Sequence, residues 1–118
     1  MSKNLTGACD TIADLKGEKP VIEIVWVMQA APDRLADFEK VYSPSGRWVQ
    51  LFRQAEGYIS TGLLPDLETE DRFLVIDRWR DLTSFESFKK RHQTEYDELD
   101  RQCEALTIKE TRIGIFKS

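Results

Sequence analysis

The chain has 118 residues, of which 41% are hydrophobic and 32% are charged, and its formal net charge is −4. This length predicts one globular domain, and the mild acidic excess argues against a nucleic-acid partner, because phosphate binding needs clustered Lys and Arg. No apolar run is long enough to cross a bilayer, and the N-terminus lacks the apolar core of a signal peptide. We therefore expect a cytoplasmic protein with no membrane partner.

Residues 1–19 are polar and without clear periodicity, so we expect a polar leader before a domain over 20–118. Cys9 and Cys103 belong to no CxxC motif, which argues against a zinc or thioredoxin-type site, and we expect both to be free thiols. The single histidine, His92, excludes multi-histidine metal motifs, and no glycine-rich phosphate loop is present. The sequence thus predicts neither a metal nor another cofactor.

The first predicted element is a strand over 21–28, where dense β-branched and aromatic residues indicate apolar side chains on both faces. A helical region with Pro32 in its first turn follows, and Ser43-Pro-Ser-Gly46 divides it before Gly57. Strands over 58–64 and 73–79 are predicted to form a hairpin. Thr83-Ser-Phe-Glu86 resembles a capping box for a second helical region, whose apolar residues from Phe85 to Cys103 keep one continuous helical face. A last strand is predicted over 108–116.

This order of elements, βαββαβ, predicts an α+β, ferredoxin-like fold with an antiparallel sheet and with the helices on one face. The opposite face of the first strand is also apolar, and a chain of this length has too few helices to cover it. We therefore expect a homodimer in which a partner sheet covers that face. Glu23 interrupts the apolar first strand, and we expect it to form an ion pair with Arg78 or Arg112.

The step from the third strand into the second helical region, Trp79-Arg-Asp-Leu-Thr-Ser-Phe85, and the strand entry at Gly57-Tyr58 resemble the antibiotic biosynthesis monooxygenase-like domains. These belong to the dimeric α+β barrel superfamily, and the resemblance covers about residues 20–116. It implies a small apolar cavity between sheet and helices in each protomer. It also implies one of two chemistries, oxygenation of polyketide-like phenols without metal or flavin, or the binding and degradation of haem.

The haem-degrading members resemble one another in an Asn on the first strand and in a His that follows the tryptophan more closely. The only Asn here is Asn4, in the leader, and His92 lies further behind Trp79. Both departures place haem binding last among the alternatives.

Six residues are the candidate site. His92 is expected to be a base and Tyr96, one turn on, a hydrogen-bond donor. The expected walls for a flat ligand are Trp79, Phe88, Tyr58 and Trp48. The alternative for His92 is a neutral core histidine, and for the aromatic residues it is core packing.

The sequence thus predicts a cofactor-independent monooxygenase acting on a small aromatic or polyketide-like substrate. A small-ligand-binding dimeric barrel without catalysis is the alternative, and a haem-binding protein ranks behind both.

Overall fold

The computed structural model describes residues 21–117. The expected leader over 1–19, with Cys9, lies outside the described residues. The elements are, in order, β1 (Ile22–Ala30), η1 (Pro32–Arg34), α2 (Leu35–Tyr42), α3 (Arg47–Phe52), β2 (Tyr58–Pro65), β3 (Arg72–Trp79), α4 (Leu82–Arg91), α5 (Gln93–Cys103), η2 (Glu104–Leu106) and β4 (Thr107–Lys117). The strands and helical regions expected from the sequence are therefore present.

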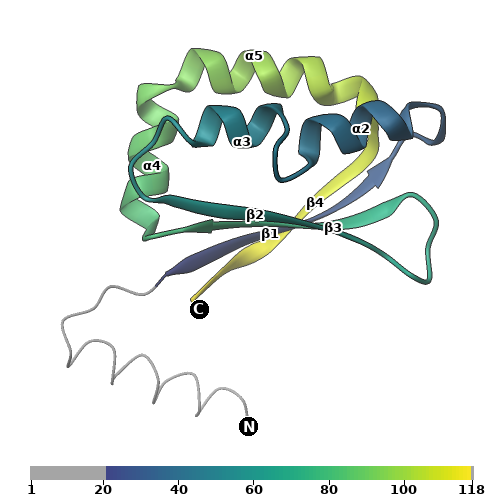
Figure 1. Cartoon of the computed structure of the whole chain (residues 1–118), viewed down its shortest axis with the longest axis horizontal. Coiled ribbons are helices and arrows are strands. Elements are labelled where there is room, and N and C mark those ends of the chain that lie inside the picture. The colour runs from purple at the N-terminus through teal and green to yellow at the C-terminus, as the bar shows by residue number, and fades with distance from the viewer. Residues whose placement is uncertain (1–20, 118) are drawn as a thin grey trace, which may run out of the picture.

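The four strands form one antiparallel sheet in the order β2-β3-β1-β4, and the helices lie on one of its faces (Figure 1). This is the predicted ferredoxin-like α+β architecture. Among the described residues, no helix is long and apolar enough to span a membrane.

The core forms where the inward side chains of the sheet meet the helices. Ile22, Ile24 and Met28 alternate along β1 and are buried, as a period of two requires for a strand with one face on the core. Trp79, at the end of β3, is completely buried, with ring centroids of Phe52 and Phe88 5.5 and 5.3 Å away. Aromatic packing between sheet and helices therefore holds this end of the domain together.

The second helical region differs from its prediction in two ways. The residue that caps α4 is Asp81, whose carboxylate accepts a hydrogen bond from the backbone N–H of Ser84, so the predicted capping box from Thr83 to Glu86 is wrong. An Asp two residues earlier satisfies the free N–H groups of the first turn equally well. The predicted apolar face from Phe85 to Cys103 is buried or half-buried, but it belongs to two helices and not to one, because the backbone leaves the helical conformation at His92 (φ −114°, ψ 30°) and α5 begins after it.

Gly46 permits a close approach between α2 and α3. A Cβ atom at this position would lie 2.3 Å from the carbonyl oxygen of Val41 and 2.6 Å from that of Lys40. These are backbone atoms and cannot turn aside as a flexible side chain would. The glycine therefore sets where α3 begins, and with it the place of Trp48.

Replacing Gly46 by Ala is expected to lower the free energy of unfolding by about 1–3 kcal/mol, because the added methyl overpacks this turn. Urea unfolding would measure the change. Gly62→Ala is the matched control, since a Cβ atom there meets nothing closer than 3.4 Å. Equal stability of the two variants would contradict the role given to Gly46.

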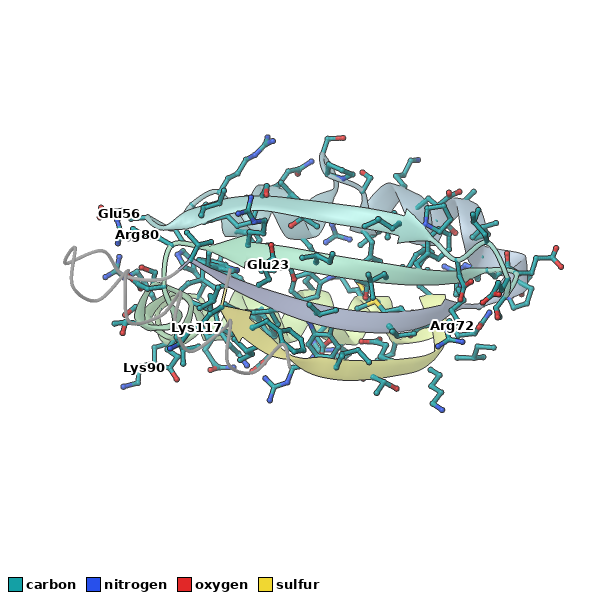
Figure 2. The ribbon with its side chains drawn as sticks, turned by 90° about the horizontal axis from the view of Figure 1, so that it is seen from below. Glu23, Glu56, Arg72, Arg80, Lys90 and Lys117 are labelled. Carbon is teal, nitrogen blue, oxygen red and sulfur yellow. The ribbon has the colours of Figure 1, made fainter. Side chains whose placement is uncertain are left out.

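The face of the sheet that the helices leave bare carries an apolar patch (Figure 2). Its β1 and β3 side chains are half-buried and alternate with the core residues, and those from β2 and β4 are exposed. We call the following set the open-face patch: Val25, Val27, Leu64, Leu74, Ile76, Ile113 and Phe116.

Glu23 lies on the same face. Its carboxylate is 3.1 Å from Nε of Arg78, the residue opposite it on β3, so of the two expected partners Arg78 is the one it meets.

Candidate active site

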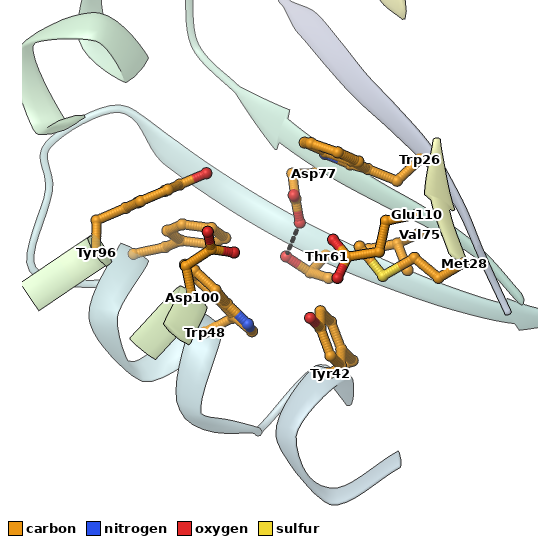
Figure 3. A pocket seen from close by; sticks show the side chains of 11 residues that line it. Trp26, Met28, Tyr42, Trp48, Thr61, Val75, Asp77, Tyr96, Asp100 and Glu110 are labelled. Carbon is orange, nitrogen blue, oxygen red and sulfur yellow. Dashed lines mark hydrogen bonds between the residues drawn. The ribbon is translucent and has the colours of Figure 1, made fainter. Parts of the chain in front are cut away.

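A cavity of about 50 Å³ lies between the sheet and helices α2, α3 and α5 (Figure 3). Strands and helices both contribute to its wall. Its aromatic lining residues are Trp26, Tyr42, Trp48, Phe52 and Tyr96. The remaining lining residues are Met28, Thr61, Val75, Asp77, Asp100 and Glu110. An apolar hollow with a few polar groups is the usual form of a small-molecule site.

Asp77 is the buried acid of this cavity. It occupies an inward position of β3, opposite Thr61 of β2, and is 9% exposed. Burial raises the pKa of its carboxyl from 3.8 to about 6, and the hydrogen bond from Thr61 partly offsets that rise. A carboxyl with this pKa is largely ionised at neutral pH and is able to accept a proton from a bound ligand.

A chain of two hydroxyl groups, those of Thr61 and Tyr58, extends from the Asp77 carboxylate. Thr61 Oγ1 donates to Asp77 Oδ1 at 2.8 Å, and the Tyr58 hydroxyl lies 2.8 Å from the same Thr61 oxygen. The register of β2 on β3 produces this arrangement, since it places Thr61 across from Asp77. The acid is thereby held in one orientation by its neighbouring strand.

The cavity also presents hydrogen-bond donors. The indole N–H of Trp48 is buried and turned toward the Tyr42 hydroxyl (Figure 3), and it interacts with that hydroxyl and with the Cys103 thiol rather than with a backbone group. Burial first, and then the nearby carboxylates of Asp100 and Asp77, raise the pKa of Tyr96 to about 12. Burial likewise raises the pKa of Tyr42. Both phenols therefore keep their protons at neutral pH and are available as donors.

The structure separates the six predicted site residues. Trp48 and Tyr96 line the cavity, and Tyr58 reaches it through Thr61. Trp79 and Phe88 are buried in the core and do not line the cavity.

His92 lies elsewhere. It lines a separate polar hollow with Arg80 and Glu56, its ring stacks on Phe88 with centroids 5.2 Å apart, and its Nδ1 is 2.7 Å from Glu95 Oε1. The break between α4 and α5 at this residue explains why it does not share the cavity with Tyr96.

Asp77 was not among the sequence candidates, although the sequence contains its signal. Positions 73, 75, 77 and 79 of β3 alternate as Phe, Val, Asp and Trp, and all are buried. An acid in the inward phase of a central strand is costly unless it has a partner or a function. The alternation of inward and outward positions, which predicts the core residues of β1, also places Asp77 among the inward residues of β3.

These features define a ferredoxin-like α+β domain with an aromatic cavity and a buried acid between its sheet and helices. The family model for antibiotic biosynthesis monooxygenase matches residues 21–95, and the chain belongs to this family.

Solved structures share the fold. SnoaB, a cofactor-independent oxygenase from Streptomyces nogalater, is 19% identical with a TM-score of 0.69, covering 85% of this chain and 94% of its own. A Pseudomonas aeruginosa protein is 19% identical with a TM-score of 0.59 over 85% and 93% of the two chains. A conserved protein from Methanosarcina mazei is 20% identical with a TM-score of 0.59 over 84% and 93%. No match was found among curated proteins.

Proposed function

We propose that this protein is a cofactor-independent monooxygenase acting on a small aromatic or polyketide-like substrate with an acidic C–H group. The observation that carries the proposal is Asp77, a buried carboxyl with a raised pKa that faces an aromatic cavity. Membership of the antibiotic biosynthesis monooxygenase family and the likeness in fold to SnoaB support it.

In the proposed reaction, Asp77 takes a proton from a CH₂ group activated by the ring. The resulting carbanion passes one electron to O₂, and the two radicals combine to a peroxide anion. Asp77 returns its proton to this anion, which gives a hydroperoxide and restores the carboxylate. Loss of water then leaves a C=O group, so one oxygen atom enters the product and the other leaves as water. The substrate itself supplies the four electrons, and no further reductant is needed.

The other lining groups have supporting roles in this proposal. The buried N–H of Trp48 and the hydroxyl of Tyr96 donate to the oxygen that gains charge as the proton leaves. The cavity is smaller than the roughly 150 Å³ that admits benzene. A ring therefore enters fully only when a half-buried wall residue, Trp26 or Tyr96, turns outward.

Oxygen uptake tests the function. With a panel of anthrone-like phenols, the protein is expected to consume one O₂ per substrate. Asp77→Asn is expected to lower the rate about a hundredfold or more, the usual contribution of a general base. The matched control is His92→Gln, expected to stay within a few-fold, because His92 lies outside the cavity. No uptake by folded protein, or a larger loss in the histidine variant, would refute this assignment; ligand binding without uptake would favour the non-catalytic alternative.

We also propose that a second copy of the chain covers the open-face patch. An apolar patch of seven side chains across four strands is a surface that soluble monomers seldom leave bare, and a two-fold pairing of sheets buries the same residues from both copies. The Glu23–Arg78 pair would then lie at the edge of the interface.

A further inference from the structure

We propose that the ligand of this cavity carries a positively charged amine, held between the aromatic rings and the carboxylates of Asp77, Asp100 and Glu110. The inference rests on the proposed function in taking this cavity as the site, and it goes further by naming the charge of the substrate.

The first observation is the charge of the cavity wall. Asp77 lies at its floor, while Asp100 of α5 and Glu110 of β4 are exposed side chains of the same wall. Of the described residues that line the cavity, none is Lys, Arg or His. The shifts of the lining phenols agree with a negative field: after burial, the causes that raise the pKa of Tyr96 are all carboxylates.

Basic side chains do approach the cavity from outside. The Lys89 ammonium lies 4.8 Å from the centroid of the Tyr96 ring, and Arg112 is opposite Trp26 on β4. Neither lines the cavity. Lys89 shows in addition that the Tyr96 ring already attracts a cation on one face.

The second observation is the aromatic wall. Two indoles and two phenols surround the space, and the indole has the aromatic face that attracts cations most strongly. Trp48 and Tyr96 meet edge to face, with centroids 5.0 Å apart, so their rings form one continuous part of the aromatic wall. Aromatic faces beside carboxylates suit an ammonium group better than a strongly hydrated metal ion. The described residues contain no group of three side chains placed to chelate a metal.

A cationic substrate also removes a difficulty in the proposed chemistry. Proton transfer moves the negative charge from Asp77 onto the substrate, beside the carboxylates of Asp100 and Glu110, and like charges repel. An ammonium group on the same substrate offsets these carboxylates before the proton is transferred. An anionic ring acid would instead meet repulsion both on binding and on reaction.

Three phenols with short side chains of different charge test the inference: tyramine and 4-ethylphenol, which are matched in size, and the anionic 3-(4-hydroxyphenyl)propionate. Calorimetric titration at pH 7.5 and low salt is expected to give tyramine at least about tenfold tighter binding than 4-ethylphenol, with the propionate weakest. Equal binding of the three, preference for the propionate, or no binding by any of them would overturn the inference.

A second test replaces the two exposed carboxylates at the rim of the cavity, Asp100 and Glu110. Asp100→Asn combined with Glu110→Gln is expected to bring the tyramine dissociation constant close to that of 4-ethylphenol, while 4-ethylphenol itself binds as before. Both positions are exposed, so the fold is expected to tolerate the change. Glu86→Gln combined with Asp33→Asn removes two exposed acids outside the cavity; it is the control for net charge and should leave the preference intact. Full preference in the double variant would overturn the role given to the rim.

The two proposals fail separately. Preferential binding of tyramine without oxygen uptake by any phenol would support the proposed ligand charge and refute the proposed monooxygenase activity. Oxygen uptake with an anionic phenol as the best substrate would support the proposed monooxygenase activity and refute the proposal that the ligand carries an amine.

Discussion

Replacing Asp77 by Asn is expected to stabilise the protein at pH 8 by up to about 3 kcal/mol while it removes the proposed base. Burial raises the pKa of the folded-state carboxyl from 3.8 to about 6, so ionisation of Asp77 is unfavourable in the folded chain. Asn keeps an oxygen that accepts from Thr61 and carries no charge. The Asn variant therefore has the higher free energy of unfolding, because it avoids the cost of burying the ionised Asp77 carboxylate.

The pH dependence has a defined sign. Between pH about 4 and about 6, the folded protein holds a proton on Asp77 that the unfolded chain has released, so the wild type loses stability as pH rises through this window. The Asn variant lacks this loss. Its advantage should be small at pH 4 and reach its full size above pH 7.

Urea unfolding of both proteins from pH 4 to pH 8 would measure this difference. Asp33→Asn, an exposed carboxyl in η1, is the control and should track the wild type at every pH. A stability difference between Asp77→Asn and wild type that does not change with pH would show that Asp77 does not titrate as described.

Replacing Val25 by Asp is expected to raise the dissociation constant of the proposed dimer by about a hundredfold or more. Val25 lies at the centre of the open-face patch, opposite Ile76. An unpaired charge buried in such an interface costs about 3–5 kcal/mol, and each 1.4 kcal/mol is about tenfold in the dissociation constant. In a two-fold dimer the substitution is present on both sides of the interface.

Sedimentation at micromolar concentration would show the change, with the wild type as a dimer and the variant as a monomer or an aggregate. Ala36→Asp adds the same charge at an exposed position of α2 and should leave the dimer intact. A well-folded wild-type monomer under these conditions would contradict the proposed dimer.

The sequence predicted the fold well because hydrophobic periodicity carries over directly into burial. The inward phase of β1, seen in Ile22, Ile24 and Met28, is the phase buried in the structure. Local hydrogen bonding was harder to predict. Asp81 and Thr83 are both able to cap a helix, and the pattern alone does not say which residue stands at the turn.

The site was predicted less well than the fold, and one backbone break accounts for much of the difference. Helical spacing placed His92 and Tyr96 on one face, but the chain leaves the helix at His92, and only Tyr96 reaches the cavity. Spacing along one element also gives no information on groups that meet across strands. The contact of Thr61 with Asp77 depends on the register of β2 on β3, which sequence periodicity does not determine.

The chain of hydroxyls behind Asp77 gives its hydrogen bonds a direction. An ionised carboxylate only accepts hydrogen bonds, so the single hydroxyl proton of Thr61 must be donated to Asp77. The Tyr58 hydroxyl must then donate its proton to the Thr61 oxygen. When Asp77 takes up a proton, the carboxyl is able to donate and the order of the whole chain is free to reverse. The hydroxyl orientation of the half-buried Tyr58, on the edge strand of the sheet, is thus fixed while Asp77 is ionised and free to change when Asp77 is protonated.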